Sequence, residues 1–275
     1  MTPLLSIILY TVMKIATRNV NGIRAIADKW FAERLLQEDI DILCIQEPKA
    51  FVTQIPQTIS HLRDTYEHIW HESSTPGYAG SAIIYKKSLW SISWTPYFAG
   101  HSQLMDDGRT TEITLWAIKI INCYFPNWSP RADGREMLWY KLSFYETMVS
   151  YIQSCQADGF EVIVTGDFNI CHREIDIARP KENEHSIGFL PIEREKIWRL
   201  MESCGLTDVF RHFYPDLRDK YTRWSYRAGA RPRNVWRRLD YMMASPWLIT
   251  TIDDCIHYDQ TPWSDHCPVM ITLTI

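Results

Sequence analysis

Residues 162–169 decide the fold, and they read Val-Ile-Val-Thr-Gly-Asp-Phe-Asn. The apolar run at the start of this stretch predicts a buried strand, and the Gly-Asp pair predicts that the strand ends in a loop. Because Asp167 and Asn169 lie two residues apart, their side chains point to the same side of an extended backbone. A loop that displays an acid and an amide from a rigid strand is a common place for reactive groups.

Other short apolar runs also predict strands, and helical spacing of apolar residues predicts three helices. The strands are expected at residues 14–17, 40–45, 81–85, 89–94, 111–118, 120–124, 239–244 and 268–275. The helices are expected at residues 25–37, 134–155 and 193–204. Strands and helices alternate irregularly, which favours an α/β fold with two packed, mixed β-sheets and helices outside them. No linker or repeat divides the chain, so we expect residues 13–275 to form a single domain.

Composition excludes several classes of protein. The chain has 275 residues, of which 46% are hydrophobic, so it is long enough for a large core and is not intrinsically disordered. The formal net charge of −4 gives no sign of nucleic-acid binding for the chain as a whole. Seven scattered cysteines without a Cys-x-x-Cys pair predict reduced thiols in a cytoplasmic protein. No segment reaches transmembrane length, and we expect no membrane association.

Residues 1–12 form an apolar stretch whose origin the sequence leaves open. The stretch lacks the basic start and the small-residue cleavage site of a signal peptide, and it is too short to span a bilayer. Met13 offers a second start. We therefore expect an N-terminal extension that is either an extra edge strand or an artefact of the assigned start, with a signal peptide as the less favoured alternative.

Carboxylates, amides and one imidazole stand where further predicted strands begin or end. The blocks are Asn19-Val20-Asn21-Gly22, Gln46-Glu47, Arg238-Leu239-Asp240 and Ser264-Asp265-His266. Such groups hold a hard divalent cation such as Mg²⁺ and help to break a phosphate ester. A charged residue that closes a buried run, as Glu47 does, costs free energy unless it is paired or bound to metal. Taken alone, Glu47 is better interpreted as a solvated acid, so the prediction depends on the whole set.

The blocks also suggest separate roles in catalysis. Asp167 is placed to orient or deprotonate a water molecule, while Asn169 donates hydrogen bonds to phosphate oxygens. Asp265 supplies a further metal ligand. Asp240, from a separate strand end, is expected to orient His266 in the way that an acid orients a catalytic imidazole. We interpret the other eight histidines as surface or structural residues.

Positive charge is concentrated in residues 218–238, which contain eight Arg or Lys residues and a single acid, Asp219. Tyr221, Trp224, Tyr226 and Trp236 are interleaved with them. Cations together with aromatic rings favour a polyanion that carries bases. A solvated basic face is the usual alternative for such a run, but the adjacent Asp240 favours function. Asp107-Gly108-Arg109 is a weaker cationic element.

Taken in order, these blocks resemble the exonuclease III / abasic-site endonuclease family, a branch of the endonuclease–exonuclease–phosphatase superfamily. The resemblance runs from about Met13 to Ile275. Further motifs that carry it are Gly77-Tyr78-Ala79-Gly80, Tyr124-Phe125-Pro126-Asn127, Gly188-Phe189-Leu190-Pro191-Ile192-Glu193-Arg194 and Trp236-Arg237-Arg238-Leu239-Asp240-Tyr241. Residues 224–231 are more similar to the human-type and Gram-positive subgroup than to the enterobacterial exonuclease.

The resemblance implies a four-layer, deoxyribonuclease-I-like α/β sandwich and an activity in base excision repair. That activity is Mg²⁺-dependent hydrolysis of double-stranded DNA 5′ to an abasic site, with Mn²⁺ as a possible substitute. The resemblance also implies 3′–5′ exonuclease or 3′-phosphodiesterase activity on blocked 3′ ends, and we expect a monomer.

The resemblance also assigns residues by matching position. It implies a metal site formed by Asn21, Glu47 and Asp265. It implies the catalytic residues Tyr124, Asp167, Asn169, Asp240 and His266. The substrate contacts that it implies are Asn19, Tyr78, Arg109, Asn127, Arg131, Asn183, Arg223, Trp224, Arg237 and Leu239.

The chain departs from the family pattern at several positions. Arg18 replaces the apolar residue that usually precedes Asn19, and Ser186 stands where the subgroup generally has asparagine. Arg223 and Arg237 occupy two places where aromatic residues line the abasic-sugar pocket of the family. Ala16 stands at the position of the redox cysteine of the human-type enzymes, so that role is not implied.

Two alternative functions stay open. One is a phosphomonoesterase of the same superfamily that acts on a small substrate such as an inositol phosphate. The other is a catalytically silent DNA-binding module. The sequence of residues 170–176 and the basic, aromatic tract favour the nuclease over the first alternative, and the complete set of catalytic-type residues disfavours the second. Release of inorganic phosphate from a small molecule would establish the phosphomonoesterase. DNA binding without nicking would establish the silent binding module.

Overall fold

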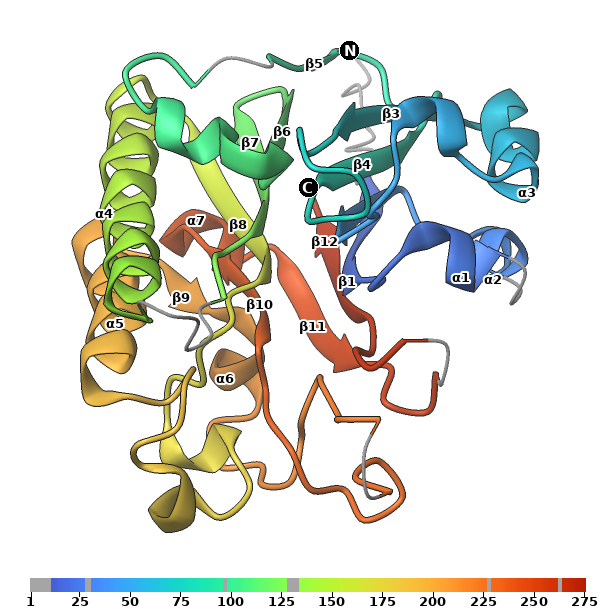
Figure 1. Cartoon of the computed structure of the whole chain (residues 1–275). Helices are drawn as coiled ribbons and strands as arrows, with labels where there is room; N and C mark the ends of the chain where they lie inside the picture. The colour runs from blue at the N-terminus through green and yellow to red at the C-terminus, as the bar shows by residue number, and fades with distance from the viewer. Residues whose placement is uncertain (1–10, 28–30, 96–97, 128–133, 227–228, 262–263) are drawn as a thin grey trace, which may run out of the picture.

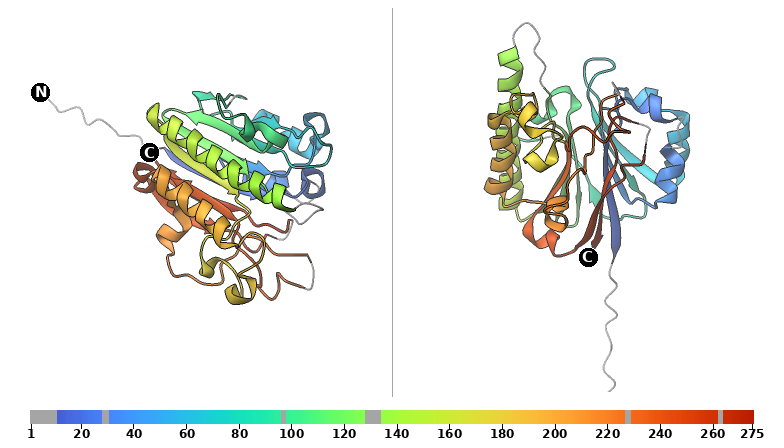
Figure 2. Two further views of the ribbon diagram at one scale, coloured as in Figure 1. Left: turned by 60° about the vertical axis from the view of Figure 1, so that its left-hand side comes forward. Right: turned by 90° about the horizontal axis from the view of Figure 1, so that it is seen from below.

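The computed structural model describes residues 11–27, 31–95, 98–127, 134–226, 229–261 and 264–275. Two six-stranded sheets pack face to face, and helices cover the outer face of each (Figure 1). The right-hand view of Figure 2 shows the four layers in order: helices, sheet, sheet, helices. The predicted four-layer α/β sandwich with two mixed sheets is confirmed.

The first sheet has the strand order β11-β12-β1-β2-β4-β3. Its strands are β1 (Val12–Asn19), β2 (Ile42–Gln46), β3 (Tyr66–His71), β4 (Ser81–Lys86), β11 (Ile252–His257) and β12 (Val269–Thr274). β1 runs parallel to β2 and antiparallel to β12. The register of β1 and β2 pairs Asn19 with Gln46, so the polar blocks that begin at these two residues leave the sheet side by side, at the C-terminal ends of the two strands.

The second sheet has the strand order β5-β6-β7-β8-β10-β9. Its strands are β5 (Ile92–Ser93), β6 (Thr110–Leu115), β7 (Ile118–Tyr124), β8 (Glu161–Asp167), β9 (Thr207–Asp208) and β10 (Asp240–Ala244). β8 is parallel to β7 and antiparallel to β10. The register therefore places Tyr124, Asp167 and Asp240 in one row across three neighbouring strands.

Helices cover both sheets. The helices α1 (Ile23–Ala27), α2 (Phe31–Gln37) and α3 (Gln57–Ser60) lie over the first sheet, and α4 (Gly134–Ala157) and α5 (Pro191–Cys204) lie over the second (Figure 1). The short helices α6 (Val209–Phe213) and α7 (Pro246–Ile249) follow β9 and β10 in the chain. Within the described ranges, every helix is too short or too polar to cross a membrane.

The side chains between the two sheets change from apolar to polar toward one end. Alternate positions of β1 run Met13, Ile15, Thr17, Asn19, and those of β8 run Ile163, Thr165, Asp167; all are buried. At the polar end, Gln46 Nε2 donates to Asn122 Oδ1 at 2.6 Å. Because Gln46 and Asn122 belong to different sheets, this buried bond fixes how the strand ends of the two sheets face each other.

Several predicted elements differ from the structure. The predicted strand at 111–118 breaks after Leu115, where Trp116 turns the chain with a φ of 55° and β7 begins. The run at 89–94 contributes only the two residues of β5, and the predicted helix at 25–37 contains two helices, α1 and α2, on either side of residues outside the described part. Strands β3 and β11 were missed because edge strands expose one face and carry polar residues there.

The N-terminal extension is described only at its end. Val12 begins β1, and Thr11 exchanges backbone hydrogen bonds with Ile275 at 2.7 and 3.1 Å. Residues 1–10 lie outside the described residues. All seven cysteines are buried and none is in a disulfide.

Candidate active site

Strand ends from both sheets meet at one site. Asn19, the last residue of β1, donates from Nδ2 to Asp167 Oδ2 at 2.8 Å and to Glu47 Oε1 at 2.7 Å. Asp167 is the last residue of β8 in the other sheet, and Glu47 directly follows β2. One buried amide therefore joins the carboxylates of two separate sequence blocks.

Asp167, Asp240 and His266 form a buried cluster beside this amide. His266 Nδ1 lies 2.8 Å from Asp240 Oδ2, and His266 Nε2 lies 3.8 Å from Asp167 Oδ2. Thr222 Oγ1 donates to Asp240 Oδ2 at 2.6 Å, which holds the carboxylate in place. The structure thus brings the predicted pair Asp240 and His266 into contact, with the second imidazole nitrogen facing Asp167.

Burial and the neighbouring charges shift the pKa values of both Asp167 and His266. Burial raises the pKa of Asp167 to about 7; the positive charge of His266 opposes the rise, and Asp240 and Glu47 add to it. Burial alone would lower the pKa of His266, but the carboxylates of Asp240 and Asp167 outweigh it and raise that pKa to about 9. Near neutral pH the imidazole is therefore protonated, and Asp167 is poised to exchange a proton.

Oxygen atoms of two predicted metal ligands, Glu47 and Asn21, contact the ammonium group of Lys49. Lys49 Nζ lies 2.7 Å from Glu47 Oε2 and 2.6 Å from Asn21 Oδ1. Asn21 Nδ2 in turn donates to Asp265 Oδ1 at 3.1 Å. Carboxylate and amide oxygens are the donors that Mg²⁺ takes in proteins. The chemistry of Glu47, Asn21 and Asp265 therefore fits a hard divalent cation, and their role as its ligands stays a prediction.

Asp265 remains ionised despite its burial. Burial raises its pKa, but His266, Arg223 and the amide of Asn21 outweigh this and hold the pKa below its ordinary value. Arg223 Nε contributes an ion pair to Asp265 Oδ2 at 3.3 Å.

Three site residues have a left-handed backbone. The φ values of Asn21, Glu47 and Asn169 are 47°, 50° and 52°. Residues other than glycine seldom adopt this conformation, and it persists where the surrounding contacts hold it. Each of the three lies just after the end of a strand, where the left-handed conformation turns the chain and keeps the residue close to the strand ends that form the site.

A buried ion pair holds Asn169. Lys141 Nζ on α4 donates to Asn169 O at 2.9 Å and to Glu193 Oε1 on α5 at 2.7 Å, and both charged side chains are fully buried. Glu193 Oε2 accepts the N–H groups of Gly188 at 2.6 Å and Leu190 at 3.2 Å. The Asn169 side chain itself donates to Phe125 O at 2.9 Å. The Asp167–Asn169 loop is thus tied to both outer helices.

Sequence reasoning missed Lys49, Thr222 and the roles of Lys141 and Glu193. A signal existed for Lys141, which lies among apolar residues on one side of the predicted helix at 134–155. A cation in that position requires a buried partner. Thr222 carries no such signal, since its partner Asp240 lies 18 residues away. Lys49 lies two residues from one partner, Glu47, but its other partner, Asn21, comes from a distant part of the chain.

A buried arginine, Arg109, packs against the ring of Tyr124. Arg109 is 1% exposed, donates from Nη2 to Tyr78 OH at 2.7 Å, and places its Cζ 5.0 Å from the centre of the Tyr124 ring. Arg109 is therefore covered by Tyr78 and Tyr124, and a direct contact between Arg109 and DNA stays a prediction. Burial raises the pKa of Tyr124, which stays a neutral phenol. Asn127 is exposed, and Arg131 lies outside the described residues.

The comparison with known sequences decides the family. The sequence pattern of the Endonuclease/Exonuclease/phosphatase family matches residues 17–266. The chain belongs to this family. It is 36% identical over 264 residues to an exodeoxyribonuclease of Bacillus subtilis, covering 96% of this chain and 100% of that protein. It is 33% identical to the DNA repair nuclease APEX1 of Danio rerio, covering 96% of this chain and 83% of that one.

A solved structure of the family has the same architecture. The AP endonuclease LMAP from Leishmania major superposes with a TM-score of 0.84 at 28% identity, covering 96% of this chain and 88% of that one. An AP endonuclease from Archaeoglobus fulgidus superposes with a TM-score of 0.82, also at 28% identity, over 95% of this chain and 99% of that one.

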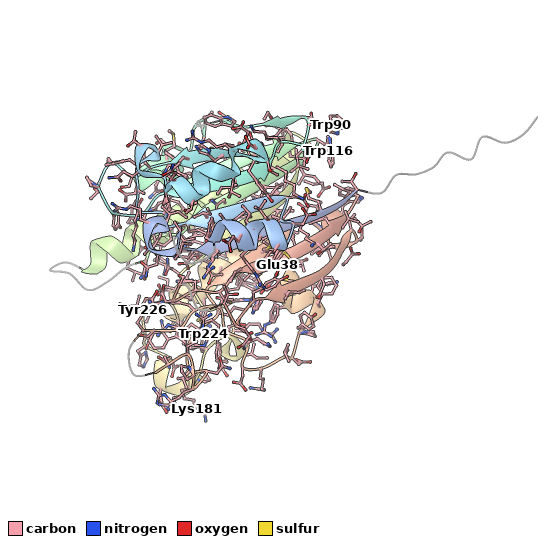
Figure 3. All side chains as sticks on the ribbon, turned by 90° about the vertical axis from the view of Figure 1, so that its right-hand side faces the viewer. Glu38, Trp90, Trp116, Lys181, Trp224 and Tyr226 are labelled. Carbon is pink, nitrogen blue, oxygen red and sulfur yellow. The ribbon has the colours of Figure 1, made fainter. Side chains whose placement is uncertain are left out.

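In this member of the family, two predicted substrate contacts are buried. Trp224 is 3% exposed, donates from Nε1 to Asn234 Oδ1 at 3.1 Å, and lies under the guanidinium of Arg231. Leu239 belongs to a small buried apolar cluster. Neither side chain offers an open surface here, and their direct contact with the substrate stays a prediction. Figure 3 shows Tyr226, which is 71% exposed, near Trp224.

The basic tract is only partly available to a ligand. Arg238 is fully buried between Asp176 and Asp208, at 2.8 and 2.6 Å. Arg231 donates to the backbone oxygens of Ser264, Asp259 and Thr261. These two cations are structural. Arg223 and Arg237 are partly exposed, and Asn183 meets Arg237 Nη2 at 3.4 Å.

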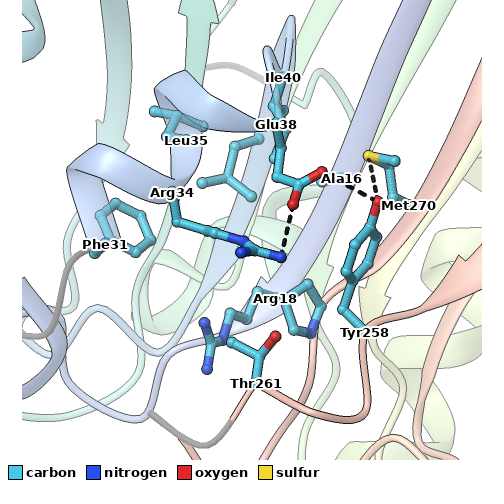
Figure 4. A pocket seen from close by; sticks show the side chains of 12 residues that line it. Ala16, Arg18, Phe31, Arg34, Leu35, Glu38, Ile40, Tyr258, Thr261 and Met270 are labelled. Carbon is cyan, nitrogen blue, oxygen red and sulfur yellow. Dashed lines mark hydrogen bonds and ion pairs between the residues drawn. The ribbon is translucent and has the colours of Figure 1, made fainter.

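Arg18, which directly precedes Asn19, lies next to His266. It is 3% exposed, and its Nη2 donates to His266 O at 3.4 Å. Burial lowers its pKa to about 10, so it stays charged at neutral pH. Arg18 also lines a mainly apolar hollow on the outer face of the first sheet, where Figure 4 shows the ion pair of Arg34 and Glu38.

Proposed function

We propose that the chain is a Mg²⁺-dependent DNA-repair nuclease that cleaves the phosphodiester 5′ to abasic sites in duplex DNA and also processes blocked 3′ ends. The observation that carries the proposal is the meeting of two groups of residues through Asn19. One is the buried cluster of Asp167, Asp240 and His266, and the other is the oxygen set of Glu47 and its neighbours. The family members named as exodeoxyribonucleases and DNA repair nucleases support the same activity.

The residues divide the work of phosphodiester hydrolysis. Asp167 accepts a proton from the attacking water, and Asn19 holds the carboxylate in the required position. Protonated His266 donates to a phosphate oxygen and stabilises the charge that develops there. The P–O3′ bond breaks, and the 3′ oxygen takes a proton and becomes a hydroxyl group. A cation at Glu47, Asn21 and Asp265 supplies charge neutralisation when it is bound.

Duplex DNA is favoured as substrate over a small phosphomonoester. Arg223 forms a backbone bridge to His266; Arg223 and Arg237 are partly exposed, and the ring of Tyr226 is exposed. A small phosphomonoester would not need these additional cationic and aromatic groups. Arginine and aromatic side chains are suited to a backbone with bases. We expect the nuclease to act as a monomer.

Glu47→Gln is expected to raise the Mg²⁺ concentration needed for the half-maximal rate by about tenfold or more, because the carboxylate ligand becomes a weaker neutral amide. The measurement is the initial rate of nicking of a duplex with one abasic analogue as Mg²⁺ is titrated. Mn²⁺ is expected to replace Mg²⁺, since it also takes oxygen ligands.

Glu195→Gln provides the control, because Glu195 lies on α5 in an exposed ion pair with Arg199. An unchanged Mg²⁺ requirement in the Glu47 variant would remove Glu47 from the metal site.

Activity is expected to follow a bell-shaped dependence on pH, with limbs near 7 and near 9. Asp167 must be ionised to accept a proton, so activity rises with pH through its raised pKa of about 7. His266 must be protonated to donate, so activity falls as pH rises through its pKa of about 9. The measurement is kcat/KM from about pH 6 to about pH 10.

Asp240→Asn should move the alkaline limb to lower pH, because the carboxylate that raises the His266 pKa is gone. A profile without limbs, or an alkaline limb unmoved in that variant, would contradict the assignment.

A further inference from the structure

Two arginines lie side by side next to the catalytic imidazole. Arg223 and Arg237 exchange backbone hydrogen bonds at 3.0 and 3.3 Å, and Arg223 also forms a backbone bridge to His266. Residues directly opposite one another in an antiparallel pair place their side chains on the same face. Both guanidinium groups lie against Trp236, with Cζ atoms 5.5 and 5.6 Å from the ring centre.

Both guanidinium groups keep donors for a ligand. A guanidinium has five N–H donors. Among the described residues, Arg223 uses Nε for Asp265, and Arg237 bonds with Ile187 O and, at 3.4 Å, with Asn183 Oδ1. The Arg223 side chain is 32% exposed. These bonds to described residues use fewer than half of the donors of the pair, and both side chains are partly exposed.

The two guanidinium charges repel each other. Burial lowers the pKa of Arg237, and the neighbouring charge of Arg223 lowers it further, while Cys171 and Glu193 act in the opposite direction. Asp265, which contacts Arg223, is shared with Asn21. An anion between the two guanidinium groups would relieve their repulsion, whereas a neutral group would lose its hydration there without gaining an ionic partner.

We propose that Arg223 and Arg237 make this nuclease selective for DNA 3′ ends that carry an additional acidic group, over internal abasic sites with a neutral sugar. Two such ends share this chemistry: a 3′-phosphate, which carries a second negative charge, and a 3′-phosphoglycolate, which carries a carboxylate. Planar guanidinium groups bind phosphate and carboxylate oxygens through paired, charge-assisted hydrogen bonds. The inference rests on the proposed function, whose catalytic cluster performs the reaction.

Removal of the 3′ group is the same hydrolysis of a P–O3′ bond as cleavage at an abasic site, but the group released is different. Water adds to the terminal phosphorus and the P–O3′ bond breaks. The 3′ oxygen takes a proton and becomes the 3′-hydroxyl group. Phosphate or phosphoglycolate leaves with the oxygen of the water, so atoms and charge balance without any further reactant.

The test measures kcat/KM on three duplexes of the same sequence, in the presence of Mg²⁺. One carries a gap with a 3′-phosphate, one a gap with a 3′-phosphoglycolate, and one an internal abasic analogue. The wild-type chain is expected to process at least one acid-ended duplex about tenfold faster than the abasic one. Arg237→Gln is expected to lower that ratio by about tenfold. Arg237→Lys should give a ratio between those of the wild type and Arg237→Gln, since lysine keeps the charge but lacks the planar pair of N–H donors.

Two variants complete the design. Arg223→Gln tests the second arginine and replaces Arg237→Gln if the latter does not fold. Arg199→Gln, an exposed arginine on α5, is the matched control and should leave the ratio unchanged. A preference for the phosphate end alone or for the phosphoglycolate end alone supports the inference and identifies which acid is bound.

Equal wild-type rates on the three duplexes, a preference for the abasic duplex, or a ratio unchanged in the glutamine variants would overturn the inference while leaving the proposed function intact. Absence of any turnover by folded wild-type protein would instead overturn the proposed function.

Discussion

Asp167→Asn is expected to lower kcat for cleavage of an abasic duplex by about a thousandfold or more, because the group that takes the proton from water is lost. The substitution keeps the size of the side chain, and the amide oxygen can still accept from the backbone N–H of Asn169, as Oδ1 does now at 2.9 Å. Substrate binding should therefore survive.

Relative to the wild type, the same variant should be more stable above neutral pH than at acid pH. Burial raises the pKa of Asp167 above its ordinary value, so ionisation of this group weakens the folded state, and the weakening is complete once the pH exceeds about 7. A neutral amide removes that cost. Thermal unfolding at two pH values and single-turnover cleavage provide the measurements. Asp158→Asn, an exposed position, is the control. A variant at Asp167 that keeps a tenth of the wild-type rate would exclude it as the base.

Lys141→Met is expected to destabilise the protein by about 3–5 kcal/mol, because it removes the cation that neutralises the buried Glu193 carboxylate. It also removes the donor to Asn169 O, so the catalytic loop should lose its tie to α4. Urea unfolding measures the free energy, and cleavage of the abasic duplex under folding conditions measures the effect on the loop.

The double variant Lys141→Met/Glu193→Gln tests the cause of this effect. With the carboxylate neutralised, the double variant should be more stable than Lys141→Met alone, a non-additivity that a packing defect would not produce. Lys87→Met, in an exposed ion pair with Glu67, should stay within about 0.5 kcal/mol of the wild type. A double variant no more stable than the single one would contradict the account.

The sequence was informative where chemistry follows directly from local pattern. The polar blocks at strand ends were visible because apolar runs stop at them, as at Asp167 and Glu47. Pairing between distant strands is what turns these blocks into a site. The register that aligns Tyr124, Asp167 and Asp240 depends on β7, β8 and β10 together, and no local window of the sequence contains it.

Burial of charged and aromatic residues was the least predictable feature. The sequence shows that Arg238 and Trp224 lie in a basic, aromatic tract, but not that one is enclosed by Asp176 and the other by Asn234 and Arg231. Asp176 comes from a distant loop, whereas Asn234 and Arg231 lie in the same tract and meet Trp224 only because the chain folds back on itself. The ammonium of Lys49 beside the metal ligands is likewise a product of tertiary structure.

One assay tests the central claim most directly: a labelled duplex with a single abasic site, incubated with the purified chain in Mg²⁺ or in EDTA. The account predicts a single nick immediately 5′ to the abasic site, with a 3′-hydroxyl end, that requires the metal and is absent from an intact duplex. Binding of the duplex without metal-dependent nicking, or release of inorganic phosphate from a small substrate with no cleavage of DNA, would contradict it.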